Sequence, residues 1–192
     1  MRSSIGYVPQ AISVDGALTA RENLDFYASV TGVPRRERRE RIEQVIVEMD
    51  LAEMLDRLAR TFSGGMLRRL EIASALLNRP AVPFLDEPTV GLDPTARHVV
   101  WERLTALRDE AGTTIVFTTH VMEEVERYAE RLVIMDEGHV VEQGEPAEVC
   151  ARHGMEDLEE VFTAVTGHGI YEQRKGRLRD VRAQRRTARR LG

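Results

Sequence analysis

Apolar and polar residues follow two different periods along the chain, and these periods predict strands and helices. Short apolar runs rich in Val, Ile and Phe predict strands within residues 3–10, 81–86, 113–119, 131–136 and 137–144. Apolar residues that recur every three to four positions predict helices within residues 18–32, 35–55, 61–80, 95–110 and 154–167, with another after His120. Strands that alternate with helices indicate an α/β protein with a parallel sheet.

Local signals predict where several of these helices begin, end and bury their apolar faces. Thr19 and Glu22 form a capping box before the first helix, and Gly32 is expected to end it. Pro80 is expected to end the helix that follows the sequence SGGM. The arginine-rich start of the helix within residues 35–55 is interpreted as solvated surface. The predicted inner faces are Ile42, Val45, Ile46 and Met49 in that helix, and Met66, Leu70, Ala73 and Leu77 in the next.

Three carboxylates follow one predicted strand, in the sequence FLDEPTVGLDP at residues 84–94. Ligands of open α/β sheets bind beyond the carboxyl ends of the strands, where Asp86 and Glu87 are expected to lie. Successive strand side chains point to opposite faces, so the two acids are expected to have different targets. This arrangement suits one acid that holds hydrated Mg²⁺ and another that orients a water for attack on a phosphate. A pair of helix-capping acids is the alternative.

Three further positions fall at strand or helix ends, and each also has an ordinary structural explanation. His120 follows a predicted strand and could donate a hydrogen bond to a phosphate oxygen, but a lone histidine is more often structural. Gln10 stands at another strand end and means little by itself. The turn at Ser63, Gly64 and Gly65 opens a helix, where free backbone N–H groups can bind an anion.

The order of these motifs resembles that of the ATP-binding cassette (ABC) proteins. Gln10, then TFSGGMLRRLEIASALL, FLDEPTVGLDP and TTIVFTTH, occur at spacings typical of the family, and the resemblance covers about residues 4–167. SGGMLRRLEIA and the later LEEVFTAVTG are similar to the ATP-binding subunits of ABC-2 type drug exporters. Met66 stands where other ABC signatures have glutamine, which the drug-exporter group tolerates. Pro83 departs from the family pattern inside the predicted strand 81–86 and puts the regularity of that strand in question.

The resemblance implies a role for each motif residue. Asp86 resembles the Walker B aspartate and Gln10 the Q-loop glutamine, and the two together would bind Mg²⁺. Glu87 resembles the catalytic base. His120 resembles the switch histidine at the γ-phosphate of ATP. The remaining positions resemble residues that act across a dimer: Ser63, Gly64 and Gly65 of the signature, and Asp93 of the D-loop.

The resemblance also implies a P-loop, G-x-x-x-x-G-K-[ST], which holds the phosphates of ATP. The 192 residues contain no such motif, and their only lysine, Lys175, lies in the sequence QRKGRLR. Gln10 lies nine residues after Met1, which leaves no room upstream for the P-loop within this sequence. The expected fold is therefore a P-loop NTPase-type parallel sheet with an inserted helical subdomain, without the N-terminal strands and Walker A. An exposed apolar sheet face or edge is expected as a consequence.

Charge and composition limit the kinds of partner and compartment that the sequence predicts. Net charge is −5, but residues 171–192 carry nine Lys/Arg against two Asp/Glu, so the body is acidic and its tail basic. The acidic body gives no reason to expect nucleic acid. The single cysteine, Cys150, fits a reducing compartment. No apolar run approaches the roughly 20 residues that span a bilayer, so any membrane role would need a partner. The resemblance implies a transmembrane permease subunit and a second ATP-binding subunit as partners, and a location on the inner face of the cell membrane.

The predicted organisation is a partial ABC domain over residues 1–170 and a basic, disordered tail over 171–192. Within the domain, residues 15–80 form the helical subdomain with the signature, 81–145 the catalytic core and 146–170 the C-terminal helices. Anionic lipid binding and unselected translation are alternative explanations of the tail. Three functions remain open: part of a working exporter ATPase, a non-hydrolysing partner that lends its signature, or an ATPase of DNA repair or chromosome structure. The absence of long coiled-coil segments disfavours the third.

Overall fold

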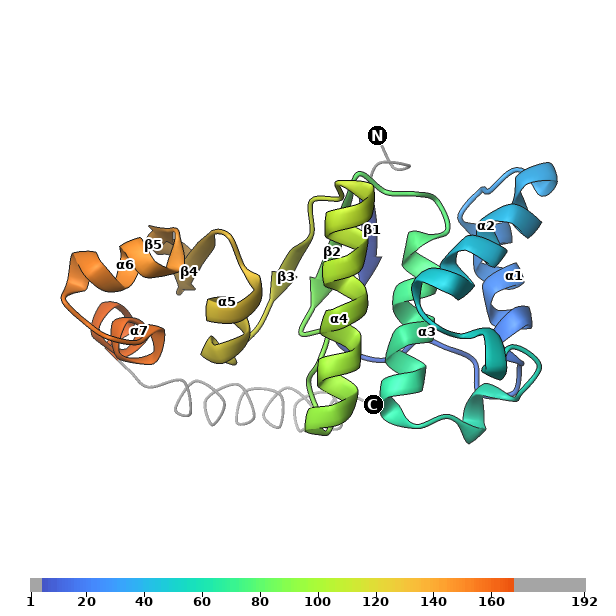
Figure 1. Cartoon of the computed structure of the whole chain (residues 1–192), viewed down its shortest axis with the longest axis horizontal. Helices are drawn as coiled ribbons and strands as arrows, with labels where there is room; N and C mark the ends of the chain where they lie inside the picture. Colours follow the sequence, from blue (N-terminus) through green and yellow to red (C-terminus); the bar gives the residue numbers. More distant parts are fainter. Residues whose placement is uncertain (1–4, 168–192) are drawn as a thin grey trace, which may run out of the picture. The chain divides into compact units, whose positions relative to one another are not determined.

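The computed structural model describes residues 5–167, which divide into two compact units, residues 5–119 and 120–167 (Figure 1). The predicted basic tail, residues 171–192, lies outside the described part. No helix in residues 5–167 is both long and apolar enough to cross a membrane. The predicted three-part division of the domain stays a prediction.

The first unit contains a parallel sheet of three strands in the order β1-β2-β3. These are β1 (Ile5–Val8), β2 (Val82–Asp86) and β3 (Val116–Thr118). Pro83 does not disturb β2, since it pairs with Gly6 of β1, whereas pairing with β3 begins only at Phe84. The register then places Asp86 opposite Thr118 at the carboxyl edge. The α/β class is confirmed, although β3 is shorter than the predicted strand within 113–119.

Two helices, α3 (Gly64–Leu76) and α4 (Pro94–Ala111), cover one face of this sheet. Gly6 allows α3 to approach β1, because a Cβ there would lie 2.8 Å from the Ala75 carbonyl oxygen. On α4, the Trp101 ring meets the Phe117 ring of β3 edge-on, with centroids 4.7 Å apart. The covered strand residues include Val8 and Leu85, which are at most 2% exposed.

The opposite face of the sheet is open. Its apolar side chains are 38% to 60% exposed: Ile5, Tyr7, Phe84 and Val116. Parallel sheets are normally covered on both faces, so this face is unusual for the class. The prediction of an exposed apolar sheet face is confirmed.

Two helices precede α3, namely α1 (Ala20–Val30) and α2 (Arg35–Glu48), and both pack against it (Figure 1). The capping box of α1 is present as predicted. The predicted inner face of α2 is buried, with Ile42, Val45, Ile46 and Met49 at most 6% exposed. The helix predicted within 35–55 was too long: α2 ends at Glu48, and two short 3-10 turns, η2 (Ala52–Met54) and η3 (Ala59–Thr61), lead to α3.

The second unit is built around a two-stranded antiparallel sheet of β4 (Leu132–Asp136) and β5 (His139–Gly144). Its helices are α5 (Met122–Tyr128), α6 (Pro146–His153) and α7 (Leu158–Thr166). The core of the unit consists of Leu132, Ile134, Val149, Leu158, Val161 and Phe162. The sequence predicted all of these elements except α6 as a separate helix.

Candidate functional site

Asp86 lies at the carboxyl end of β2, where strand pairing provides its first partner. The Thr118 hydroxyl donates to Asp86 Oδ1 at 2.6 Å, and the Tyr7 hydroxyl lies 3.5 Å from Oδ2. The carboxylate is only half-buried. It is therefore oriented from both neighbouring strands while part of its surface stays accessible.

Glu87 has an unusual backbone conformation for a glutamate, with φ at +45°. Its N–H donates to the Thr118 hydroxyl at 3.0 Å and to the Thr118 carbonyl at 3.2 Å, which holds the chain in this left-handed region. Positive φ outside glycine is costly and is concentrated at functional sites. Thr118 thus links the Asp86 carboxylate to the Glu87 backbone, since its hydroxyl accepts from Glu87 N–H and donates to Asp86.

Gln10 reaches Glu87 from the loop after β1. Its Nε2 donates to Glu87 Oε2 at 2.8 Å. This contact joins positions 77 residues apart and brings together Gln10, Asp86 and Glu87, three of the sequence-predicted residues. Neither acid is the N-cap of a described helix, and the two carboxylates have different hydrogen-bond partners, Thr118 for Asp86 and Gln10 for Glu87.

The loop carrying Gln10 is held from α3. Arg68 donates to the carbonyls of Pro9 at 2.7 Å and Gln10 at 2.8 Å. Burial lowers the pKa of Arg68, while the nearby carboxylates of Glu71 and Asp86 act in the opposite direction. A buried cation beside the carboxyl edge therefore offsets part of the cost of the acids there.

The signature turn starts α3. Ser63 is the N-cap, and its hydroxyl accepts from Met66 N–H at 3.4 Å. Ser63 and Gly64 are exposed, but Gly65 is buried, and a Cβ there would lie 2.7 Å from the Cβ of Ala96 on α4. Gly65 is thus required for helix packing, whereas Ser63 and Gly64 present backbone to solvent.

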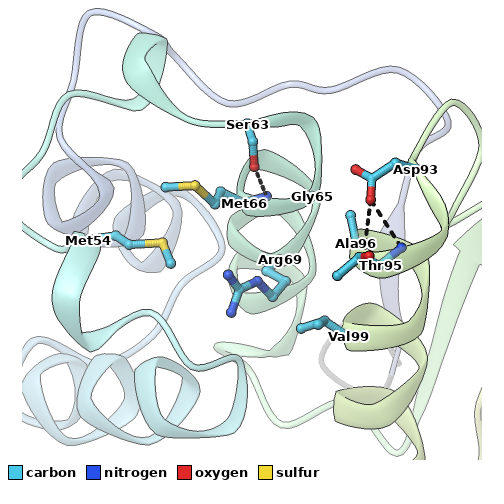
Figure 2. Close-up of a pocket in the computed structure, with 9 residues that line it drawn as sticks. All are labelled: Met54, Ser63, Gly65, Met66, Arg69, Asp93, Thr95, Ala96 and Val99. Carbon is cyan, nitrogen blue, oxygen red and sulfur yellow. Dashed lines mark hydrogen bonds between the residues drawn. The ribbon is translucent and has the colours of Figure 1, made fainter.

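A cavity of about 300 Å³ lies between the first turns of α3 and α4 (Figure 2). Asp93 stands on its α4 side and caps that helix, accepting from Thr95 N–H at 3.1 Å and Ala96 N–H at 3.0 Å. Asp93 therefore has an ordinary helix-capping role in this chain, and its D-loop role stays a prediction. The lining residues are Met54, Ser63, Gly65, Met66, Arg69, Asp93, Thr95, Ala96 and Val99.

His120 is the first residue of the second unit and is half-buried. The predicted residues thus fall into three groups: Gln10 with Asp86 and Glu87, the cavity residues of α3 and α4, and His120 in the other unit.

Sequence reasoning missed Thr118, Tyr7 and Arg68. The first could have been found from the expectation that parallel strands end at one edge, which places TTH beside LDE. Arg68 carried a weaker signal, a charged residue inside an apolar helix pattern. Among residues 5–167, no cluster of three or more His, Cys, Asp or Glu is arranged to hold a metal ion. A Mg²⁺ ion needs fewer protein ligands, since it is usually held by one or two carboxylates together with substrate phosphates, and Asp86 fits that requirement.

Comparison with known proteins identifies the family of this chain. The family model described as ABC transporter matches residues 1–90. The chain is 41% identical over 161 residues to the Nod factor export ATP-binding protein I of Ralstonia nicotianae. The chain belongs to the ABC transporter family. That alignment covers 84% of the chain but only 50% of the relative, so the chain spans about half the length of the curated ABC proteins it matches.

Other ABC relatives are also exporter or resistance subunits. The daunorubicin/doxorubicin resistance ATP-binding protein DrrA of Streptomyces peucetius is 41% identical, covering 80% of the chain and 46% of DrrA. The linearmycin resistance ATP-binding protein LnrL of Bacillus subtilis is 39% identical, covering 80% of the chain and 49% of LnrL. The predicted resemblance to exporter ATP-binding subunits is confirmed.

Solved structures agree with the fold. An ATP-binding subunit of an ABC transporter has a TM-score of 0.70 at 29% identity, over 85% of this chain and 69% of that one. CbiO1 of Clostridium perfringens, part of the ABC transporter complex cbiONQ, has a TM-score of 0.71 at 32% identity, over 79% and 61%. The parallel sheet with its helices is therefore the ABC ATPase architecture, of which the chain covers a part.

Proposed function

We propose that the chain supplies the catalytic-carboxylate and signature part of an exporter ATP-binding subunit, which couples ATP hydrolysis to transport. The observation that carries the proposal is the hydrogen bond between Gln10 and Glu87 beside Asp86 at the carboxyl edge of the sheet. The exporter and resistance names of the relatives support the transport role.

Each residue of this group has a distinct proposed task. Glu87 acts as general base toward the attacking water, since its carboxylate is held by the Gln10 amide and its backbone by Thr118. Asp86 and the amide oxygen of Gln10 would hold Mg²⁺, because the amide nitrogen of Gln10 is directed to Glu87. The metal, when bound, neutralises charge on the phosphates of ATP. His120 is proposed to contact the γ-phosphate.

The exposed start of α3 is proposed to meet ATP held by another subunit. Ser63 and Gly64 present a capped helix N-terminus to solvent, which suits phosphate binding. Asp93 lies across the same cavity and would face the dimer partner. A permease subunit and a location on the inner face of the cell membrane complete the proposal.

ATP binding needs a phosphate cradle that these 192 residues do not contain in the form G-x-x-x-x-G-K-[ST]. The decisive experiment therefore joins the P-loop segment of a relative, such as the Nod factor export subunit, before Ser4. The joined protein should hydrolyse ATP. Glu87→Gln should lower turnover by about 100-fold or more and leave nucleotide binding intact, because an amide is no base but has nearly the same shape.

A matched control is Glu102→Gln, which makes the same change at an exposed position on α4. This variant should keep full turnover. Equal turnover of the Glu87 variant and the unmodified joined protein would show that Glu87 is not the base.

A second function is favoured by the exposure of Ser63 and Gly64, which need no P-loop in the same chain to act. The chain would then lend its signature to a complete partner subunit. In such a mixture, Ser63→Arg should abolish hydrolysis, while Glu87→Gln should change it little. Ser63→Asn keeps a residue that can cap the helix, so a loss of hydrolysis in this variant would come from the lost contact with ATP and not from a lost cap. Equal losses from Ser63→Arg and Glu87→Gln would exclude this asymmetric arrangement.

A further inference from the structure

Helix α3 carries two consecutive buried arginines that hold different loops. Arg68 is 2% exposed and Arg69 is 9% exposed. Arg69 donates to the Asp50 carbonyl at 2.9 Å, and to its carboxylate at 3.1 Å. Arg68 instead holds the loop after β1. Two neighbouring side chains of the same type thus make a natural pair for comparison.

The Arg68 contacts fix the backbone conformation at Gln10. Its two terminal nitrogens donate to the carbonyls of Pro9 and Gln10, at 2.7 and 2.8 Å. These carbonyls belong to the peptide groups on either side of the Gln10 α-carbon. When both peptide planes are fixed, the direction in which the Gln10 side chain leaves the backbone is fixed too.

A second contact from α3 holds the same loop further along. Glu71, one turn after Arg68 and 4% exposed, accepts from Ser13 N–H at 2.9 Å and also from the Ser13 hydroxyl. Glu71 and Asp86 both attract the Arg68 guanidinium electrostatically. The charge of Arg68 is therefore compensated within the fold, as a buried cation requires.

We propose that Arg68 is a positioning residue for the hydrolytic site: by holding the two peptide groups around Gln10, it keeps the Gln10 amide against the Glu87 carboxylate. The functional meaning rests on the proposed roles of Gln10 and Glu87. The planar fork of arginine is needed here, since one guanidinium donates to two successive carbonyls with two different nitrogens. Lysine, a single flexible ammonium, does not reproduce this geometry.

The test compares Arg68→Met with Arg69→Met in the full chain, with no nucleotide present. The side-chain NH₂ resonances of Gln10 report its contact with Glu87, and Glu87→Ala provides the spectrum of the broken contact. Amide hydrogen exchange is measured for residues 10–15, where Ser13 N–H is bonded to Glu71, and for residues 49–54, where Leu51 N–H is bonded to Ile46.

Arg68→Met should move the Gln10 resonances to their position in Glu87→Ala and speed exchange in residues 10–15 about 10-fold or more. Arg69→Met should speed exchange in residues 49–54 and leave the Gln10 resonances in place. A merely structural role for Arg68 predicts instead that both variants loosen α3 and both loops alike. Unmoved Gln10 resonances in Arg68→Met, or equal movement in the two variants, would overturn the proposal.

If Arg68→Met does not fold, Arg68→Lys decides the question, because it keeps the charge but lacks the fork. The Gln10 resonances should then shift part of the way, and unshifted resonances would overturn the proposal. None of these measurements needs ATP turnover. If Glu87→Gln does not slow ATP hydrolysis by the joined protein, Glu87 is not the base. The positioning role of Arg68 is still tested separately, by the resonances and the hydrogen exchange.

Discussion

At the scale of single residues, one hydroxyl organises the two acids. Thr118 donates to Asp86 and accepts from Glu87 N–H, so the orientation of one carboxylate and the backbone of the other depend on the same atom. Sequence reasoning found both acids because their type and spacing are distinctive. It missed the threonine, because this residue type is not distinctive and gains its meaning only from the strand pairing that places Thr118 opposite Asp86.

Two adjacent glycines of the signature allow a matched test of packing. Gly65→Ala should lower the free energy of unfolding by about 1–3 kcal/mol, because its Cβ would lie 2.7 Å from that of Ala96. Gly64→Ala should cost much less, because the nearest atom to its Cβ is the end of the Leu92 side chain at 3.4 Å. Urea unfolding of both variants measures the difference. Ala96→Gly should rescue part of the loss in Gly65→Ala, and an equal loss at the two glycines would refute the packing role.

At the scale of elements, the ends of helices were predictable where their capping residues are of a distinctive type. The start of α1 was predictable because Thr19 and Glu22 occupy the positions of a capping box, and the structure contains both of its hydrogen bonds. The end of α2 was not, because its left-handed residue is Asp50, with φ at +52°, rather than glycine. Leu51 N–H then bonds back to the Ile46 carbonyl, and the buried Leu51 side chain helps to stop the helix. Residues typical of helices therefore continue past the true end of α2, and the helix predicted from them was too long.

The capping box gives a prediction with a defined dependence on pH. Hydrogen bonds from the Thr19 backbone and hydroxyl lower the pKa of Glu22 below its usual 4.5. Because the folded-state pKa is the lower one, the stabilisation is complete above the unfolded-state pKa and is lost as pH falls through the folded-state pKa. Glu22→Gln should therefore be less stable than the native chain at pH 7, and the gap should shrink as pH falls below about 4.5.

Urea unfolding across this pH range measures the gap. Thr19→Ala removes the partner itself and should cost about 1 kcal/mol at pH 7. Glu53→Gln, at an exposed glutamate of η2, is the charge-matched control and should show no such pH-dependent gap. A gap for Glu22→Gln that stays constant into acid would contradict the assigned hydrogen bonds.

At the scale of the whole molecule, the sequence predicted the class of the fold and the residues of the carboxyl edge, but not how they are supported. Motif spacing identified Gln10, Asp86 and Glu87, which the structure joins through hydrogen bonds. Arg68 was hidden in the signature helix, because its partners are backbone carbonyls 58 and 59 residues away. Long-range contacts to backbone leave no partner side chain in the sequence, so the charge of Arg68 inside an apolar helix pattern was the one signal it carried.

The open face of the parallel sheet leads to a prediction about the 192-residue chain by itself. Ile5 and Val116 are 55% and 40% exposed on that face, beside Tyr7 and Phe84. Apolar side chains that adjoin one another on an exposed sheet promote association, so the mass measured by sedimentation should rise with protein concentration. The double variant Ile5→Thr and Val116→Thr should weaken this rise, because threonine keeps the β-branched shape but adds a hydroxyl. Val47→Thr, at a side chain 74% exposed on α2 and away from the sheet, should have no effect. A native chain that stays monomeric at all concentrations, or a Val47 variant that weakens association as much as the double variant, would show that the open face is not what the molecules use to associate.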